Sequence, residues 1–356
     1  MKCSDKIGEK IEKGFEKDVL PSLSEINEMI KKIGKENFIG LIMNKNVLFT
    51  IEDLVASKII HEIKELKEDV INEKLWFDRI KNSIRCPPHH NFQCKEKLDR
   101  FHQILLNGQN DVCASPDNLR LMTADLALLV GTKWINIELI QHFLKLINKE
   151  IDDAVCITFR ELQDYNSAGT LASKVKRWAD KKLSKVCVIT NAGRKKGKTY
   201  FSSNTVFGNH WLCFQIDISK KEIIYCDSLV WSPPIEFLKD IKFLSQTIDS
   251  IFKTNIESYS IIFGHKNQQP PKKVHRCVDG CFKMPYQGPN MNICGAAAIF
   301  SALVLTQKDF DMKKPPNSVD WLVRIHEYND FSRCLLIKWY IDRKVTANEI
   351  WSNKKV

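Results

Sequence analysis

The stretch QGPNMNICGAAAIFSALVL, residues 287–305, decides the fold because a loop runs directly into a helix suited to burial. Gly288 and Pro289 break regular structure, and the alanine-rich run from Gly295 predicts a helix with small side chains. Cys294 therefore falls at the expected helix N-terminus, where free amides and the helix dipole favour a thiolate. For a single Cys-Gly pair the alternative is an inert buried thiol. The stretch predicts a nucleophile, provided that the chain supplies a base.

A histidine and an aspartate upstream can serve that cysteine. His210 lies in FGNHWLCFQI, residues 207–216, at the start of an expected strand, and Asp227 follows the next expected strand in IIYCDSL, residues 223–229. A turn at 219–221 makes the two strands antiparallel and brings both residues to one end of the sheet. We expect Asp227 to accept the Nδ1 proton of His210 and leave Nε2 facing the thiol. Taken singly, the histidine is equally well a surface residue and the aspartate a turn residue.

Gln287 completes the candidate catalytic set. Its side-chain amide, together with the backbone N–H of Cys294, would bind the oxyanion that forms when a nucleophile attacks a carbonyl. The four residues together indicate acyl-transfer chemistry by a cysteine.

The remaining chain predicts an α+β domain preceded by helices. Apolar residues at three-to-four spacing predict one long helix with a single buried stripe over 51–84. A turn-prone stretch at 107–118 sets the expected boundary between a helical N-terminal region, 1–115, and a catalytic domain, 116–356. Helical segments are also expected over 235–248, over 319–350 and over 119–149, where two segments meet near Gly131. Strands are expected over 154–159, 186–190, 211–216 and 222–225, and a further apolar run lies over 259–263.

The composition fits a soluble globular protein: 44% of residues are hydrophobic and 27% are charged. The longest apolar runs are far shorter than the roughly 20 residues of a bilayer span. The N-terminus is charged and lacks the apolar core of a secretory signal, so we expect an intracellular protein, nuclear or cytoplasmic, with its 12 cysteines reduced. Residues 1–115 are balanced in charge, so the remainder carries the net charge of +11 and could attract nucleic acid or an acidic protein surface.

The three blocks His210-Trp211, Asp227-Ser228-Leu229 and Gln287 to Cys294-Gly295, in this order, resemble the ubiquitin-like-protein-specific (sentrin or SUMO type, Ulp) cysteine proteases. A fourth block at 122–143, which includes Trp134, Ile135 and Asn136, is similar to the family's segment Trp-Leu-Asn-Asp-x-x-Ile-x-x-Tyr. The resemblance covers roughly residues 119–345.

The resemblance implies a permuted papain-like domain, with a central mixed sheet flanked by helices and the histidine before the cysteine. It implies a triad of Cys294, His210 and Asp227, with Gln287 in the oxyanion hole and no cofactor. Trp211 and Trp134 would cover a narrow channel for a Gly-Gly tail, since flat indoles exclude larger residues. The expected substrate-binding residues are Trp211, Trp134, Asn136 and Asn290.

The implied activity is that of a thiol protease or isopeptidase that processes or deconjugates a SUMO-type or other ubiquitin-like modifier. That modifier and its conjugates are the expected partners; no membrane is expected, and nucleic acid is not expected despite the basic surface. Gln287 stands seven residues before Cys294, one more than is usual in the family, and Ile293 replaces the usual acid. A viral-type maturation protease, an effector acetyltransferase of the same fold and a non-catalytic modifier-binding module remain as alternatives.

Other motifs are weaker. GRKKGKT, residues 193–199, is one residue short of a phosphate-binding loop and is better interpreted as a basic hairpin. Two irregular clusters are poor zinc candidates, so no metal is predicted; they comprise Cys86, His89, His90, Cys94 and His102, and His275, Cys277 and Cys281.

Overall fold

The computed structural model describes residues 22–36, 42–44, 47–49, 51–86, 92–107, 113–114, 120–195, 198–202, 210–234, 237–264, 277–278, 287, 292–308 and 328–350. The chain divides into two compact units, Met1–Trp76 and Phe77–Val356. Helix α4 (Lys95–Leu106), which falls in the predicted N-terminal region, lies within the second unit. The boundary of the catalytic domain between 115 and 116 stays a prediction.

The first unit contains helix α2 (Leu23–Glu36), the antiparallel strands β1 (Ile42–Asn44) and β2 (Val47–Phe49), and most of helix α3 (Ile51–Asn82). The long helix predicted over 51–84 is thus confirmed. The buried apolar stripe predicted for this helix is not confirmed. Leu54 is buried, but Ile63, Val70 and Ile71 are 50%, 59% and 49% exposed. Apolar spacing predicted the helix correctly but could not tell whether other residues cover the stripe.

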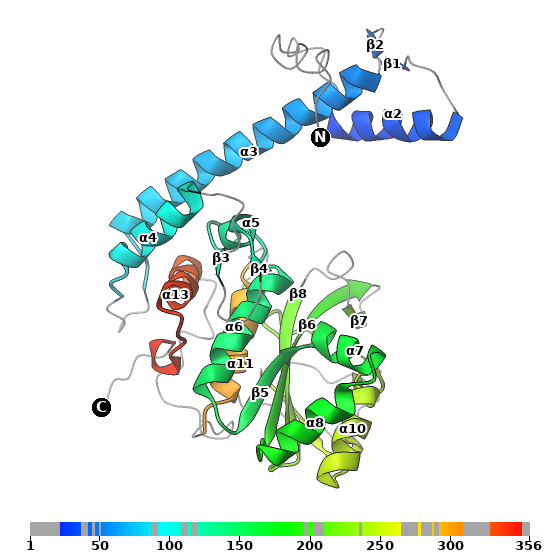
Figure 1. The fold of residues 1–356 in the computed structure, drawn as a ribbon, viewed down its shortest axis with the longest axis vertical. Helices are drawn as coiled ribbons and strands as arrows, with labels where there is room; N and C mark the ends of the chain where they lie inside the picture. The colour runs from blue at the N-terminus through cyan, green and yellow to red at the C-terminus, as the bar shows by residue number, and fades with distance from the viewer. Residues whose placement is uncertain are drawn as a thin grey trace. The chain divides into compact units, whose positions relative to one another are not determined.

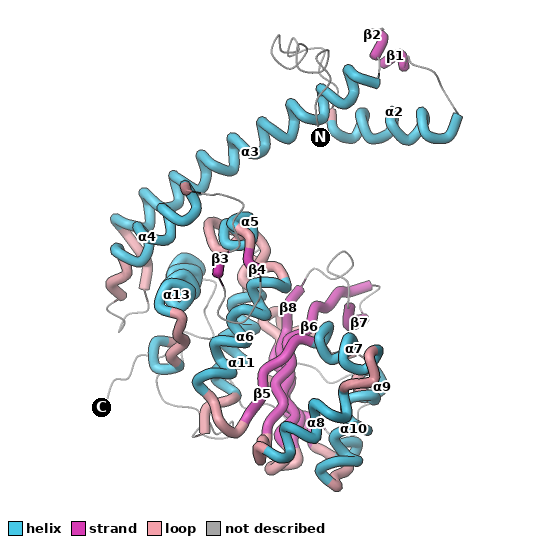
Figure 2. Tube along the Cα trace, viewed as in Figure 1, coloured by secondary structure: helices cyan, strands magenta, loops and turns pink. Residues whose placement is uncertain are grey.

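A seven-stranded mixed sheet forms the centre of the second unit, as Figures 1 and 2 show. Its strands run in the order β11-β10-β9-β8-β6-β5, with β7 paired to β6. The pairs β6–β8, β8–β9 and β6–β7 are antiparallel, and β5–β6, β9–β10 and β10–β11 are parallel. The strands are β5 (Ala154–Thr158), β6 (Lys185–Lys195), β7 (Lys198–Ser202), β8 (His210–Asp217), β9 (Glu222–Cys226), β10 (Ser260–Phe263) and β11 (Cys277–Val278).

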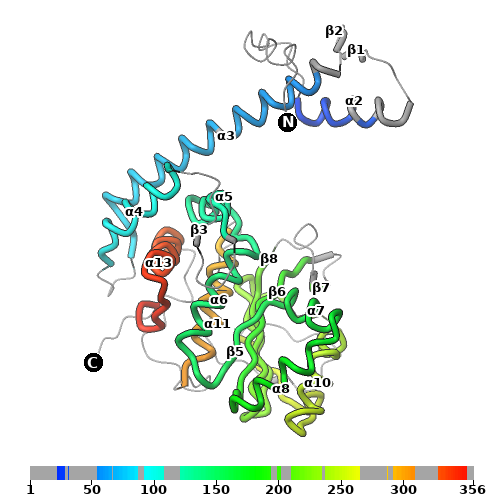
Figure 3. The backbone as a smooth tube through the Cα atoms, in the orientation of Figure 1, coloured from blue at the N-terminus to red at the C-terminus, as the bar shows by residue number. Residues whose placement is uncertain are grey.

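Helices cover both faces of this sheet (Figure 1). On one face lie α6 (Ile137–Glu150), α11 (Cys294–Leu305) and α13 (Asn329–Asp342), and in Figure 3 the orange α11 and the red α13 lie near the green α6. The other face carries α7 (Phe159–Ser167), α8 (Leu171–Asp180), α9 (Phe237–Asp240), α10 (Lys242–Phe252) and the short turn η1 (Ile256–Ser258). The predicted α+β class, with a mixed sheet flanked by helices, is confirmed.

Strand β8 is the centre of the sheet, and every one of its residues is buried. Leu212, Phe214 and Ile216 belong to the apolar core that the helices α7, α8 and α10 cover. The alternate residue Gln215 donates from Nε2 to the carbonyl of Leu305 in α11, 2.9 Å away. A strand covered on both faces reads as a continuous apolar run, which is why 211–216 was recognisable in the sequence.

Helix α11 is buried along its whole length, from Cys294 to Leu305. Its alanines allow it to approach β8 closely, and a helix that is apolar all round needs cover on every side. The sheet, α6 and α13 provide that cover. The prediction of a buried helix is confirmed.

The predicted helical segment 119–149 is two helices, α5 (Thr123–Ala127) and α6, with a loop between them. Gly131 has a φ of +70° in this loop. Asn136 caps α6 by accepting a hydrogen bond from Leu139 N at 3.1 Å. Because this cap starts α6 at Ile137, Trp134 lies in the loop, and its expected helical conformation was wrong.

The hairpin expected at 193–199 is present, because Lys195 of β6 faces Lys198 of β7. Segment 319–350 is helical over α13, and residues 319–327 lie outside the described residues. In the described part of the chain, no helix combines the length and the apolar character that crossing a membrane requires. Short elements complete the second unit: β3 (Cys113–Ala114), β4 (Arg120–Leu121) and η3 (Ala347–Glu349).

Asn148 of α6 closes the edge of the sheet at β5. Its Nδ2 donates to the carbonyl of Cys156 and its Oδ1 accepts from the amide of Cys156, both at 2.7 Å. We expect Asn148→Ala to lower the free energy of unfolding by about 1–3 kcal/mol, because two buried backbone groups lose their partner. Urea denaturation measures the change. Asn166→Ala, at an exposed site at the end of α7, is the control; equal stability of both variants would contradict the role of Asn148.

Candidate active site

The sheet brings His210 and Asp227 together. His210 is the first residue of β8, and Asp227 directly follows β9. The two strands are antiparallel, with Cys213 opposite Cys226, so the start of one meets the end of the other. Both side chains are 0% exposed. The predicted meeting of these residues at one end of the sheet is confirmed.

The two side chains form a hydrogen bond, His210 Nε2 to Asp227 Oδ1, of 2.8 Å. The expectation that Nδ1 would face the aspartate was wrong, because the ring extends across to the next strand and its distal nitrogen reaches the carboxylate. The amide of Leu229 also donates to Asp227 Oδ1, at 2.7 Å, which fixes the carboxylate. Nδ1 of His210 is buried without a hydrogen-bond partner among the described residues. It is therefore the nitrogen available to a reacting group.

Cys294 lies at the N-terminus of α11 and is 1% exposed. Burial alone would lower the pKa of His210, but the charge and hydrogen bond of Asp227, followed by Cys294, outweigh burial and raise that pKa to about 10. The thiol thus lies close enough to influence the ring, without a closed hydrogen bond to Nδ1. At neutral pH the imidazole is protonated, which is the partner that a thiolate requires.

Trp231 contacts the imidazole ring. Its ring centroid lies 4.8 Å from that of His210, with the planes at 54°. The indole limits the access of water to the His210–Asp227 pair, which strengthens the electrostatic interactions of the pair. This residue was not recognised in the sequence; its position four residues after Asp227 is the only signal there, and it has no meaning without the sheet.

Gln287 is 3% exposed and is fixed by the residue that follows Asp227. Its amide N–H donates to the carbonyl of Ser228 at 2.8 Å, and the hydroxyl of Ser228 donates to its Oε1 at 3.1 Å. Because Ser228 holds the side-chain oxygen, the nitrogen is the end that can donate to an oxyanion. Asn290, in the loop that leads to Cys294, lies outside the described residues.

The loop before α6 lies beside the nucleophile. Trp211 is 3% exposed and donates from Nε1 to the carbonyl of Ile135 at 2.7 Å. A Cβ at Gly295 would meet Cβ of Ile135 at 2.8 Å, so only glycine allows α11 to approach so closely. Trp134 is 41% exposed. These residues therefore join the loop, β8 and the first turn of α11.

Asn136 has a structural part in this loop. In addition to capping α6, its Nδ2 donates to Asp125 Oδ1 at 2.7 Å. Contact with a substrate stays a prediction for this residue.

Among the described residues, no group of three or more His, Cys, Asp or Glu side chains is placed to hold a metal ion. The described cysteines Cys86 and Cys94 are free thiols. His89, His90, His275 and Cys281 of the two sequence clusters lie outside the described residues.

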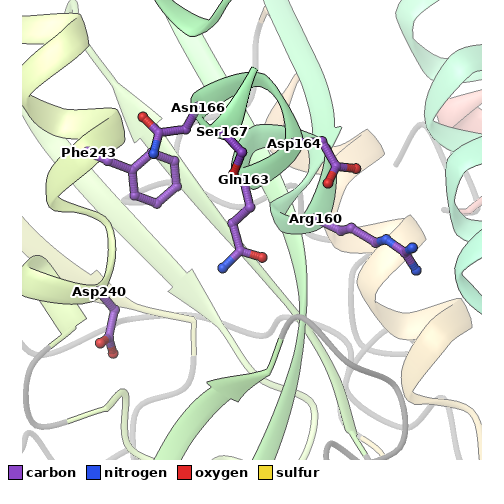
Figure 4. Close-up of a pocket in the computed structure, with 7 residues that line it drawn as sticks. All are labelled: Arg160, Gln163, Asp164, Asn166, Ser167, Asp240 and Phe243. Carbon is purple, nitrogen blue, oxygen red and sulfur yellow. The ribbon is translucent and has the colours of Figure 1, made fainter. Parts of the chain in front are cut away.

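A depression with a volume of about 740 Å³ lies on the face of the sheet opposite α11 (Figure 4). In Figure 4 its side chains do not converge on one point: Arg160 and Asp164 extend to one side, away from Asp240. None of the candidate catalytic residues lines it, so it is separate from the site described above. Its lining residues are Arg160, Gln163, Asp164, Asn166, Ser167, Asp240 and Phe243.

No family model matches the chain. A curated relative, ubiquitin-like-specific protease 1 of Saccharomyces cerevisiae, is 25% identical over an alignment of 246 residues, and the match covers 60% of this chain and 37% of that protein. The chain therefore spans less than half the length of this relative. The resemblance to the ubiquitin-like-protein-specific proteases is confirmed by this match.

Solved structures of such proteases are also similar. The SUMO protease Ulp1 with its catalytic cysteine oxidised to a sulfinic acid has a TM-score of 0.44 and 20% identity, over 71% of this chain and 98% of that chain. The C-terminal Ulp1 protease domain in complex with Smt3, the yeast ortholog of SUMO, has a TM-score of 0.44 and 20% identity, over 72% of this chain and 100% of that chain. The Ulp1-like SUMO protease catalytic domain of Chaetomium thermophilum has a TM-score of 0.43 and 13% identity, over 72% of this chain and 94% of that chain.

Gly295→Ala tests the close approach of α11. The added methyl group would press on Ile135, and we expect a loss of about 1–3 kcal/mol in the free energy of unfolding. Displacement of Cys294 should also slow its alkylation by iodoacetamide. Ser301→Ala, in the middle of the same helix, is the control for both measurements. A Gly295→Ala variant with unchanged stability and alkylation would show that the contact does not constrain the helix.

Asp227→Asn tests the cause of the raised His210 pKa. Wild-type His210 should stay protonated from pH 6 to 9, whereas the variant should lose its proton within that range, because the carboxylate charge is gone. NMR of the labelled imidazole measures the titration. The folded-state pKa of about 10 exceeds the ordinary 6.5, so the stabilisation is complete below pH 6.5 and is lost as pH rises towards 10. Asp152→Asn, at an exposed site, should change neither the titration of His210 nor the pH dependence of stability. Identical titrations of His210 in wild type and both variants would refute its pairing with Asp227.

Proposed function

We propose that this chain is a thiol protease or isopeptidase of the ubiquitin-like-protein-specific family, which cleaves after the C-terminal Gly-Gly of a SUMO-type or other ubiquitin-like modifier. The buried His210–Asp227 pair, with its second nitrogen available beside Cys294, carries this proposal. The name of the curated relative supports the substrate class, as does the complex of a similar protease domain with Smt3. The modifier and its conjugates are the proposed partners.

The geometry divides the reaction among few groups. The thiolate of Cys294 attacks the carbonyl carbon of the terminal glycine, and the imidazolium of His210 donates its Nδ1 proton to the departing amine. Water then attacks the acyl-enzyme while His210 Nδ1 accepts a proton from it, and the Cys294 thiolate is expelled, which restores the pair of thiolate and imidazolium. Asp227 holds Nε2 throughout and stabilises the imidazolium.

The oxyanion would be bound by the backbone N–H of Cys294 and the amide nitrogen of Gln287. Ser228 orients that amide before a substrate arrives, which is the preorganisation that lowers the barrier in such sites. Trp231 keeps water from the ion pair. We assign no metal and no cofactor to this sequence of steps.

Specificity for a tail without side chains would come from the indoles. Trp211 of β8 is immobilised by its hydrogen bond to the carbonyl of Ile135. Trp134, which is exposed, precedes Ile135 in the loop before α6. Two flat rings leave room for Gly-Gly and exclude larger residues. Asn136 and Asn290 are further proposed contacts with the substrate.

We place the catalytic domain at 116–356, with 1–115 as a helical N-terminal region.

The test is labelling by SUMO-type, ubiquitin and other ubiquitin-like modifiers that carry a C-terminal vinyl sulfone. Wild-type protein should form a covalent adduct at Cys294 with at least one of them. Cys294→Ala should form none, and its cleavage of the matching substrate should fall by a factor on the order of 10⁴ or more. Adduct mass and the modified peptide identify the site.

Cys156→Ala, which removes a buried thiol of strand β5, is the matched control and should react as wild type does. Absence of an adduct with every modifier, or labelling that survives Cys294→Ala, would refute the proposal. Acetyl transfer from coenzyme A to protein in the same samples would instead favour an acetyltransferase.

A further inference from the structure

Arg333 of α13 is a completely buried cation, with 0% exposure. Its guanidinium donates to three backbone carbonyls: Nη1 to Leu128 at 2.9 Å, and Nη2 to Lys133 at 2.7 Å and to Asn292 at 3.0 Å. Nε donates to Oδ1 of Asn329 at 3.2 Å. Among the described residues, no carboxylate forms an ion pair with it. The charge is therefore held by neutral dipoles.

The three carbonyls belong to the segments that build the active site. Leu128 and Lys133 bracket the loop that leads to Trp134 and Ile135. Asn292 stands two residues before Cys294. These carbonyls lie 205, 200 and 41 residues from Arg333 in the chain, so a single planar group joins parts that no local structure connects.

Burying an arginine at this place is unfavourable in free energy. Removing a guanidinium from water costs several kcal/mol, and an apolar side chain of similar size would pack without that cost. Arg333 also has a geometric property that lysine lacks, a rigid fork whose donors point in fixed directions. Both facts point to a role that requires the charge and the fork together.

Arg333 keeps its charge despite its burial. Burial lowers the pKa of Arg333 to about 10, although Asp330, Cys294 and Cys334 act in the opposite direction, so the side chain is charged at neutral pH. All five N–H donors of the guanidinium are therefore present to bind the carbonyls.

We propose that Arg333 is a positioning residue of the active site, which holds the loop before α6 and the segment before Cys294 in register. The inference rests on the proposed function only in taking Cys294 as the nucleophile. Because Arg333 is buried, it acts through the carbonyls that it binds.

Two variants test the role of the fork. Arg333→Lys keeps a positive charge but cannot hold three carbonyls, and Arg333→Met donates no hydrogen bond at all. The rate of Cys294 alkylation by iodoacetamide, measured by mass spectrometry of the peptide, reports the placement of Cys294 without any protein substrate. kcat and KM on the modifier substrate, and thermal unfolding, complete the set. Arg177→Lys and Arg177→Met, at an exposed site of α8, are the matched controls.

Both Arg333→Lys and Arg333→Met should lower kcat roughly tenfold to a hundredfold, with little change in KM, because the two segments are no longer held in register. Both variants should also slow the alkylation of Cys294. The Arg177 variants should match wild type in every measurement.

A wild-type kcat together with a wild-type rate of alkylation in Arg333→Lys would overturn the positioning. If Arg333→Met does not fold, the kcat and KM of Arg333→Lys decide the matter. If wild type cleaves no modifier, the proposed function fails, while the rate of Cys294 alkylation in Arg333→Lys still decides the role of Arg333.

Discussion

The hydrogen bond between His210 and Asp227 is formed where water has no access, and the rest of the site is arranged around it. A buried carboxylate and imidazolium are stable only while each satisfies the other, since the loss of either leaves an unpaired charge in the interior. Strands β8 and β9 fix the separation of the two residues, and Leu229 donates to the same oxygen. A preformed pair of this kind needs no reorganisation when a substrate arrives.

Packing contacts, rather than hydrogen bonds between charged groups, place the sulfur of Cys294. Helix α11 is held against Ile135 by a contact that only glycine permits, and Trp211 bonds to the carbonyl of the same residue. Close packing makes these positions rigid, because buried side chains interdigitate with few voids. Cys294 is thus positioned by an apolar helix, whereas His210 is positioned by its hydrogen bond to Asp227.

Several parts of this arrangement were predictable from the sequence. The apolar run around Trp211 and the turn at 219–221 predicted the strand pair, and from it the meeting of His210 and Asp227. Small residues after Cys294 predicted the buried helix. These predictions succeeded because strand alternation and helix composition are local properties. The nitrogen that faces Asp227 was predicted wrongly, because the direction of the ring depends on the strand beside it.

The sequence by itself determined which residues are candidates for catalysis: a cysteine after a helix-breaking loop, and a histidine and an aspartate on consecutive strands. Only the tertiary structure decided how these groups are supported. Trp231 and Arg333 carry no local signal, because a tryptophan in a turn and an arginine in a helix are ordinary. Their roles arise from contacts with residues far away in the chain, and a side chain's partners across such distances are fixed by packing rather than by its neighbours in sequence.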